Sequence, residues 1–337
     1  MQSGGKETNS YMRPPVSVIF LTTLIGAGQG LFLALFTVQL YALFQLLPAP
    51  ESRNFYAPGS LLVVLLLLAG LIASFFHLGH PERAWRAAAK WRTSWLSREV
   101  IVLPALLGTV ALFGLAHWVE WSSTLATLPS GGQIDLTVLL GILATALTFG
   151  LFVCTAMVYA CLPFLREWHS PLTVVNFILL GGASGFTLAS VVAVLAAPSL
   201  VGFLGAWALI ITALASAARL GSLVRNARLR PRSTAQSAIG VKHPKIVQKS
   251  QGAMGGSFNT REFFHGASPT TMRMVLLGFP LLAFAAPLLL LAVGLIQDAP
   301  FAFVAAFALQ YLGLLGERWF FFAQARHPQN LYYQSIA

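Results

Sequence analysis

The side chains best suited to proton chemistry in this sequence stand at the ends of long apolar runs. His77 ends one apolar run, Glu99 opens the next, and Glu317-Arg318 lies near the end of the last one. Histidine can exchange a proton near neutral pH and can hydrogen-bond a carbonyl or a hydroxyl. An ionisable residue at membrane depth is a candidate functional residue by default. Together, His77 and Glu99 would form a proton-accepting pair.

Each of these residues also has a simpler structural interpretation. His77 could be a polar anchor at the membrane interface, and Glu99 could be a helix-start residue favoured by the positive end of the helix dipole. Three such sites at one membrane depth are harder to explain in this way than any one of them alone. We therefore interpret His77, Glu99 and Glu317 as candidate proton acceptors grouped at one membrane surface.

The segment from His77 to Glu99 is the densest polar stretch between two apolar runs. It reads HLGHPERAWRAAAKWRTSWLSRE and contains five cations and three tryptophans. Pro81 suits the first turn of a helix, and residues 82–92 suit a short helix in the interface, with tryptophan toward lipid and cations toward headgroups. An ordinary interfacial anchor is the simpler role for the tryptophans.

A quinol is a ligand that these residue types suit, because it has an apolar body and two hydroxyl groups. It needs an apolar slot entered from lipid, which helices would supply, and a proton acceptor at each oxygen. Gln29 is a further candidate contact, because an unpaired amide in hydrocarbon is costly. It lies among glycines whose simpler role is close packing between helices. The segment Gly181–Gly185 has the same simpler role. A proton-coupled transporter could use the same residue types.

The composition indicates an integral membrane protein. Of the 337 residues, 57% are hydrophobic and only 9% are charged, with a mean hydropathy of +0.74, whereas soluble domains carry about 25% charge. A membrane-crossing helix needs about 20 apolar residues, and the apolar runs lack the alternation of membrane β-strands. The sequence therefore predicts an all-α integral membrane protein with eight transmembrane helices, near 16–46, 57–78, 100–119, 136–162, 172–196, 200–220, 274–297 and 300–322.

Basic residues are sorted to one side of these eight runs. Every Lys and Arg except Arg53 falls in the segments that alternate onto the side of the two termini. Because Lys and Arg are retained on the cytoplasmic side during insertion, we expect both termini and the motif loop to face the cytoplasm from the inner membrane. The expected parts are a cytoplasmic tail 1–15, helices 1–6 over 16–220 with the interfacial loop 79–99, a basic cytoplasmic loop 221–273, helices 7–8 over 274–323 and a cytoplasmic tail 324–337.

The basic loop 221–273 has too few large apolar residues to fold alone. Its charge could contact anionic lipid headgroups or an acidic face of a partner protein, or it could simply be solvated. It lacks interleaved aromatic residues, and a membrane topology argues against nucleic acid as a partner.

The 77–99 segment resembles the membrane anchor subunits of the dimethyl sulfoxide reductase type of molybdoenzyme. That family has an HLG-x-P-x-RA-W/F segment followed by an S-x-x-L/S-x-E segment. The GERWFF stretch at 316–321 also resembles the last span of the family, and the eight-helix layout agrees over nearly the full chain. The matching residues of the first two segments are His77-Leu78-Gly79, Pro81, Arg83-Ala84-Trp85, Ser94 and Leu96-Ser97-Arg98-Glu99.

The resemblance implies a membrane anchor that binds an iron–sulfur (ferredoxin-like) subunit and a molybdopterin catalytic subunit, and that exchanges electrons with ubiquinone or menaquinone. In the family, the histidine and the glutamate of the two segments are linked to quinone binding. The molybdenum and the iron–sulfur clusters would stay in the partners, so this chain would supply neither metal ligands nor residues for the molybdenum chemistry. The candidate quinone-binding residues are His77, Gly79, Arg83, Trp85, Ser97, Glu99, Glu317, Arg318 and Gln29.

Within this family, the length and motif are similar to those of the membrane subunits of cytoplasmic sulfite:quinone oxidoreductases. A basic motif loop on the inside fits a cytoplasmic catalytic partner. Electrons would then run from sulfite through the partners into quinone, and His77 and Glu99 would deliver protons to the reduced quinone. The alternative within the family is a quinol-oxidising anchor of a dimethyl sulfoxide reductase or a related reductase.

Three other functions stay open from the residues alone. Haem b needs axial ligands that face each other on helices, and no histidine sits mid-span, so His77 with an unidentified partner is the remaining arrangement. A proton-coupled transporter often has polar groups at the midplane, whereas they gather at one interface here. A purely structural tether would need neither His77 nor Glu99 for turnover.

Overall fold

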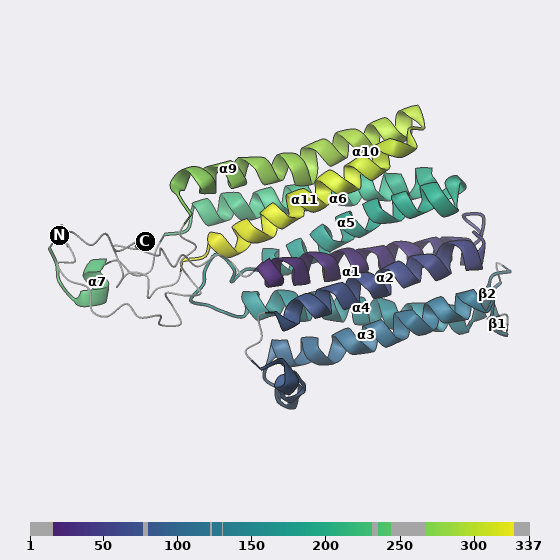
Figure 1. Ribbon diagram of the computed structural model, residues 1–337, viewed down its shortest axis with the longest axis horizontal. Coiled ribbons are helices and arrows are strands. Elements are labelled where there is room, and N and C mark those ends of the chain that lie inside the picture. The colour runs from purple at the N-terminus through teal and green to yellow at the C-terminus, as the bar shows by residue number, and fades with distance from the viewer. Residues whose placement is uncertain are drawn as a thin grey trace, which may run out of the picture.

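The computed structural model is a bundle of long helices that lie side by side along one axis (Figure 1). It describes residues 16–76, 80–121, 123–129, 131–230, 235–243 and 267–326. Over these residues, eight helical segments are long and apolar enough to cross a membrane, which confirms the predicted all-α, eight-span fold. They are α1 (Val16–Leu43), α2 (Ser52–Phe75), α3 (Trp95–Trp118), α4 (Leu136–Ala160), α5 (Pro171–Ala196), α6 (Val201–Ala227) with its leading turn η2 (Pro198–Leu200), the continuous segment α9 (Pro269–Pro280), η3 (Leu281–Ala285) and α10 (Ala286–Gln297), and α11 (Pro300–Ala323).

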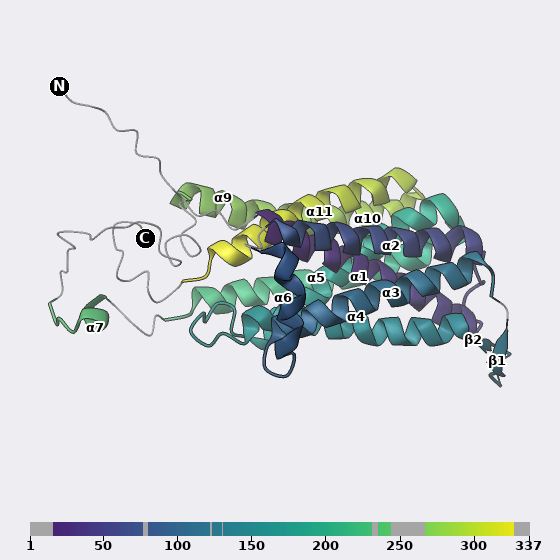
Figure 2. The same cartoon turned by 60° about the horizontal axis from the view of Figure 1, so that its bottom comes forward.

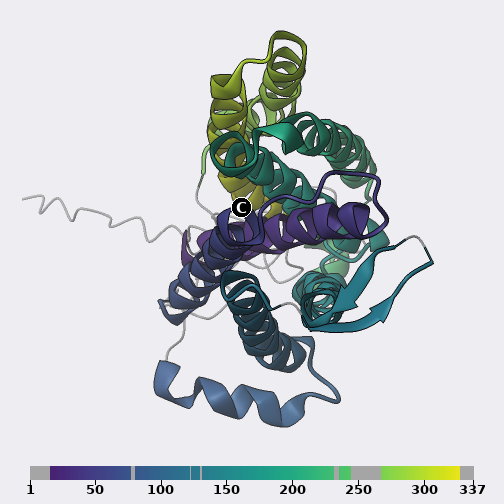
Figure 3. The same ribbon diagram turned by 90° about the vertical axis from the view of Figure 1, so that its right-hand side faces the viewer.

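The two ends of the bundle carry different structures. At one end, named the motif end, η1 (Pro81–Lys90) is a 3-10 helix that runs across the bundle axis beside the start of α3 (Figure 2). At the other end, named the hairpin end, the short strands β1 (Thr124–Thr127) and β2 (Gln133–Asp135) pair antiparallel between α3 and α4. Figure 3 looks along the bundle from the hairpin end and shows η1 lying crosswise beyond it. A short helix, α7 (Ala235–Ile239), lies between α6 and α9 in the chain.

Several helices extend further than the hydropathy suggested, and two of these differences, in α3 and α6, affect the site. The Ser94 hydroxyl caps α3 by accepting a hydrogen bond from the Ser97 N–H, so α3 begins at Trp95 and Glu99 lies inside the helix. Helix α6 continues to Ala227, past the expected boundary at 220, so Arg219 lies well inside the helix and not at its end. A cation inside a membrane helix is costly unless it is paired, and α11 supplies the partner.

Glycines bring α1 and α5 into direct backbone contact. A Cβ atom on Gly30 would overlap the carbonyl group of Gly181, and a Cβ atom on Gly185 would overlap the backbone of Gly30. Small residues allow such close approach between helices in lipid. The close-packing role predicted for these glycines is confirmed at this contact, which holds α1 and α5 together at the centre of the bundle.

Toward the hairpin end, aromatic rings fill the centre of the bundle. Phe32 of α1 and Phe113 of α3 are fully buried, with ring centroids 5.5 Å apart in an edge-to-face arrangement. Phe36 stacks beyond Phe32, and Tyr56 of α2 packs edge-on against Phe113. These four residues, named the aromatic layer, lie between Gln29 and the hairpin end.

Candidate functional site

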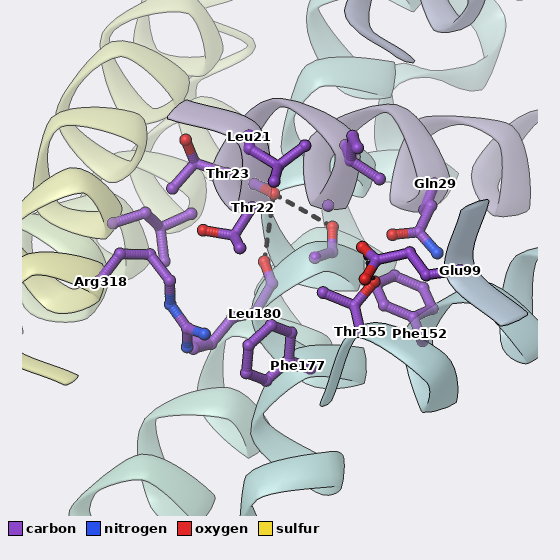
Figure 4. A pocket seen from close by; sticks show the side chains of 15 residues that line it. Leu21, Thr22, Thr23, Gln29, Glu99, Phe152, Thr155, Phe177, Leu180 and Arg318 are labelled. Atoms are coloured by element: carbon purple, nitrogen blue, oxygen red, sulfur yellow. Dashed lines mark hydrogen bonds between the residues drawn. The ribbon is translucent and has the colours of Figure 1, made fainter. Parts of the chain in front are cut away.

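A small cavity lies inside the bundle, in the half nearer the motif end (Figure 4). Its volume is about 30 Å³. Helices α1, α4, α5 and α11 form its walls, and α3 contributes one carboxylate. Its lining combines apolar side chains with carboxylate, guanidinium, amide and hydroxyl groups: Leu21, Thr22, Thr23, Ile25, Gly26, Gln29, Glu99, Phe152, Thr155, Phe177, Leu180, Gly181, Ser184, Leu314 and Arg318.

Glu99 lines this cavity from the first part of α3. The hydroxyl of Thr155 on α4 donates a hydrogen bond of 2.8 Å to Glu99 Oε1, across the contact between the two helices. Because α3 begins four residues earlier, the carboxylate is carried by a rigid helix and not by the loop before it. Glu99 was expected at one membrane surface, and the structure places it on α3, where it lines this cavity with other polar groups.

Gln29 lies on α1 and is almost completely buried. Its Nε2 donates a hydrogen bond of 2.9 Å to the backbone carbonyl of Thr148 on α4. That contact satisfies one polar group of an amide that would otherwise be costly in hydrocarbon. Gln29 and Glu99, which are far apart in sequence, thus line the same cavity, as Figure 4 shows.

Hydroxyl groups add to the polar lining of the cavity. Thr22 Oγ1 donates to the Val18 carbonyl at 2.9 Å, and Ser184 Oγ lies 3.1 Å from both the Leu180 and Gly181 carbonyls. A hydroxyl whose proton is used in its own helix still has acceptor capacity. These side chains can therefore accept a hydrogen bond from a group inside the cavity.

On the opposite wall, Arg318 of α11 lines the cavity beside a buried ion pair. Arg318 Nε lies 2.5 Å from Glu317 Oε2, and Arg219 Nε of α6 lies 2.6 Å from Glu317 Oε1. The Arg318 guanidinium carbon stands 4.3 Å from the ring centroid of Phe177, which also lines the cavity. Glu317 does not line the cavity itself, but it pairs with Arg318, which does.

The other predicted site residues that the structure describes are not brought to the cavity. Arg83 and Trp85 lie on η1 with exposed side chains, and Arg83 pairs with Glu82 at 3.6 Å. Ser97 is buried in the first turn of α3 without lining the cavity. Three members of the predicted set therefore meet at the cavity, namely Gln29, Glu99 and Arg318. His77 and Gly79 lie outside the described residues.

Two groups of site residues were missed by reading the sequence. The first comprises the hydroxyl residues Thr22, Thr155 and Ser184, which resemble ordinary packing residues of membrane helices. The second is Arg219, which stands at the expected end of the sixth span and was counted only among the cations of the cytoplasmic side. The structure pairs α6 with α11 at two points seven residues apart, Thr212 with Gln310 and Arg219 with Glu317.

The lining suits a flat ring that carries two oxygen substituents. Phe152 and Phe177 offer apolar faces, Glu99 offers a group that can exchange a proton, and Gln29 and Arg318 offer hydrogen-bond donors. The cavity is too small to hold such a ring. A cavity that accepts benzene measures about 150 Å³, whereas this cavity of about 30 Å³ holds only water-sized molecules. The polar groups therefore fit a quinone head, and its entry requires the walls to move apart.

Comparison with known proteins places the chain in a family. Residues 11–313 match the protein family described as DMSO reductase anchor subunit (DmsC). The chain is 57% identical over 326 residues to one of the sulfite dehydrogenase subunits of Allochromatium vinosum, an alignment that covers 97% of this chain and 100% of that protein. The family resemblance expected from the motif is confirmed by both matches. With eight membrane-spanning helices and a match over most of its length, the chain belongs to the DMSO reductase anchor subunit (DmsC) family.

Proposed function

We propose that this chain is the quinone-reactive membrane anchor of a molybdopterin oxidoreductase complex, where it passes electrons between an iron–sulfur subunit and the quinone pool. The observation that carries the proposal is the Glu99 carboxylate, which lines a cavity inside the bundle together with Arg318 and Gln29. Ionisable residues at such depth are costly and typically serve function. Membership of an anchor-subunit family supports the class of partner.

The electron donor of the complex is proposed from the relative in Allochromatium vinosum. That protein is a subunit of a sulfite dehydrogenase and aligns over its whole length with this chain. In the overall reaction, sulfite and water would become sulfate, while a quinone takes up two electrons and two protons and becomes a quinol. The sulfur chemistry would belong to the partner subunits, and proton delivery to the quinone would belong to this chain.

Within the cavity, each polar residue has a distinct proposed role. Glu99 would hold the proton that passes to one ring oxygen, and Thr155 would fix that carboxylate through its 2.8 Å hydrogen bond. Arg318 would donate a hydrogen bond to a ring oxygen from the facing wall, and Gln29 would offer its amide group to the same space. His77 stays a prediction as the second proton donor.

We further propose that the motif end faces the cytoplasm and binds the iron–sulfur subunit. Several exposed cations support this orientation, because basic residues are retained on the inner side during insertion. Arg83, Arg86 and Lys90 on η1 and Arg92 just after it are exposed. Electrons would then enter at the end of the bundle that is nearer the cavity.

The test uses membranes that contain the whole complex. Sulfite-dependent reduction of a short-chain quinone is measured for Glu99→Gln, with sulfite oxidation by a soluble electron acceptor as the measure of assembled partner. We expect quinone reduction to fall roughly 100-fold or more, as for the loss of a general acid or base, while the soluble-acceptor activity stays. Glu120→Gln, just beyond the hairpin end of α3, is the matched control and should behave as the wild type. Normal quinone reduction by Glu99→Gln would leave the chain as a tether only.

A further inference from the structure

Two arginines and one glutamate form a charged cluster inside the bundle, beside the cavity. Arg219 of α6 and Arg318 of α11 both pair with Glu317, at 2.6 and 2.5 Å. The three side chains are only 2%, 5% and 0% exposed, respectively. Because arginine stays protonated in proteins, two cations share one carboxylate. The cluster therefore holds an excess positive charge within the membrane-spanning part.

Neutral contacts stabilise this charge without cancelling it. Among the described residues, Nη2 of Arg219 and Nη1 of Arg318 are buried without a hydrogen-bond partner. The guanidinium of Arg318 lies over the rings of Phe177 and Phe321, and that of Arg219 lies 5.7 Å from the ring centroid of Phe279. A buried charge is expensive unless something of opposite sign meets it. Arg318 borders the cavity, so an anion located there would meet the excess charge.

We propose that Arg219 is a positioning residue that makes the cluster of Arg219, Glu317 and Arg318 a net cation beside this cavity while Glu99 carries its proton. By pairing with Glu317, Arg219 offsets the charge of that carboxylate, so that Arg318 acts on the cavity as a net cation and not as half of a neutral pair. The inference rests on the proposed quinone function. As electrons reach a quinone, negative charge builds up on a ring oxygen, and a fixed cation stabilises that charge most at the transition state. Glu99 supplies the proton, and the positive charge of the cluster stabilises the negative charge on the ring oxygen.

The proposal is tested with charge variants in the assembled complex. Arg219→Met leaves a neutral Glu317–Arg318 pair, so kcat for sulfite-driven quinone reduction should fall on the order of tenfold, the size of a unit-charge effect at the effective protein dielectric. The KM for quinone should change little, because an interaction made only in the transition state affects kcat. Arg219→Lys should keep most of the rate. Combining Arg219→Met with Glu317→Gln restores one net positive charge and should recover much of the lost kcat.

Thr212→Val is the matched control for a purely structural effect. Thr212 lies about two turns before Arg219 on α6 and accepts a hydrogen bond of 3.0 Å from Gln310 Nε2 of α11. Its loss weakens the link between the same two helices without a change of charge, so kcat should stay at the wild-type value. Assembly of each variant is checked by sulfite oxidation with a soluble acceptor.

Two results would overturn the inference. In the first, Arg219→Met keeps the kcat of the wild type although Glu99→Gln has lost quinone reduction. The other is a double variant, correctly assembled, that turns over no faster than Arg219→Met. Undiminished quinone reduction in Glu99→Gln is a different outcome, because it would contradict the proposed quinone function and not only the role of Arg219.

Discussion

Thr155 departs from the usual behaviour of a hydroxyl residue in a membrane helix. Thr22 and Thr145 donate to carbonyls of their own helices, at 2.9 and 2.8 Å. Thr155 instead donates across the helix contact to Glu99. Since the Glu99 side chain could otherwise adopt several rotamers, this one bond fixes where its carboxylate lies. The geometry of the site therefore depends on a residue that is unremarkable in the sequence.

We expect Thr155→Val to slow quinone reduction without abolishing it. Valine keeps the shape of threonine but removes the donor, and an ordinary hydrogen bond contributes about 0.5–1.5 kcal/mol. A fall in kcat of up to roughly tenfold would follow, measured as sulfite-dependent quinone reduction. Thr155→Ser keeps the hydroxyl and should remain close to the wild type. Equal rates in the valine and serine variants would show that the bond has no part in turnover.

Among individual residues, the sequence identified site residues of rare types and missed those of common types. Glu99, Gln29 and Arg318 could be identified because charged and amide groups are scarce in apolar runs. Arg219 could not, because a cation at the end of such a run is normally a boundary residue. Only a carboxylate on another helix, Glu317, makes its position inside the membrane tolerable. Pairing between helices that are distant in sequence is not readable from one chain.

At the scale of the elements, α1 and α5 carry most of the apolar and hydroxyl walls of the cavity. Their spacing is set where Gly30 meets Gly181 and Gly185, a contact of backbone on backbone. Any side chain at this contact would push the helices apart. The same contact therefore determines both the stability of the bundle and the width of the site.

We expect Gly185→Ala to destabilise the protein. The added methyl group would overlap the backbone of Gly30, and overpacking of this kind costs about 1–3 kcal/mol. The measurement is the thermal unfolding midpoint of the purified complex, which should fall. Gly108→Ala on α3 is the control, because no atom lies within 4 Å of its new Cβ and its midpoint should not fall. An unchanged midpoint in Gly185→Ala would mean that α1 and α5 can separate at little cost.

The helices themselves were predictable because a span must be long and continuously apolar. Irregular turns within these helices were not predictable from the sequence. Helix α9 passes through a π-helical turn, Leu281–Ala285, after Pro280, and Ala283 of this turn packs against Gly313 of α11. Such turns arise from the fit between neighbouring helices and from the missing N–H of proline. The short interfacial helix expected over 82–92 is present as η1, although it is a 3-10 helix.

At the scale of the whole molecule, the uneven distribution of charge predicts the orientation in the membrane. The native Cys161 can report it, because it is exposed at the motif end of α4, whereas Cys154 is buried. A membrane-impermeant maleimide should label Cys161 in inside-out vesicles and leave right-side-out vesicles unlabelled. Cys161→Ser should abolish the labelling. Adding Thr127→Cys, exposed on β1, to that variant should give the opposite pattern, and the reverse of both results would invert the topology.

Under the proposed function, the aromatic layer bears on whether turnover can charge the membrane. Phe32, Phe36, Phe113 and Tyr56 stand between the cavity and the hairpin end. If electrons and protons both arrive from the motif end, each turnover is electroneutral, and sulfite oxidation would feed the quinol pool without charging the bilayer. In sealed proteoliposomes that contain the complex and quinone, a voltage-sensitive dye should stay silent upon addition of sulfite. A dye response abolished by an uncoupler would mean that protons pass the phenylalanine rings.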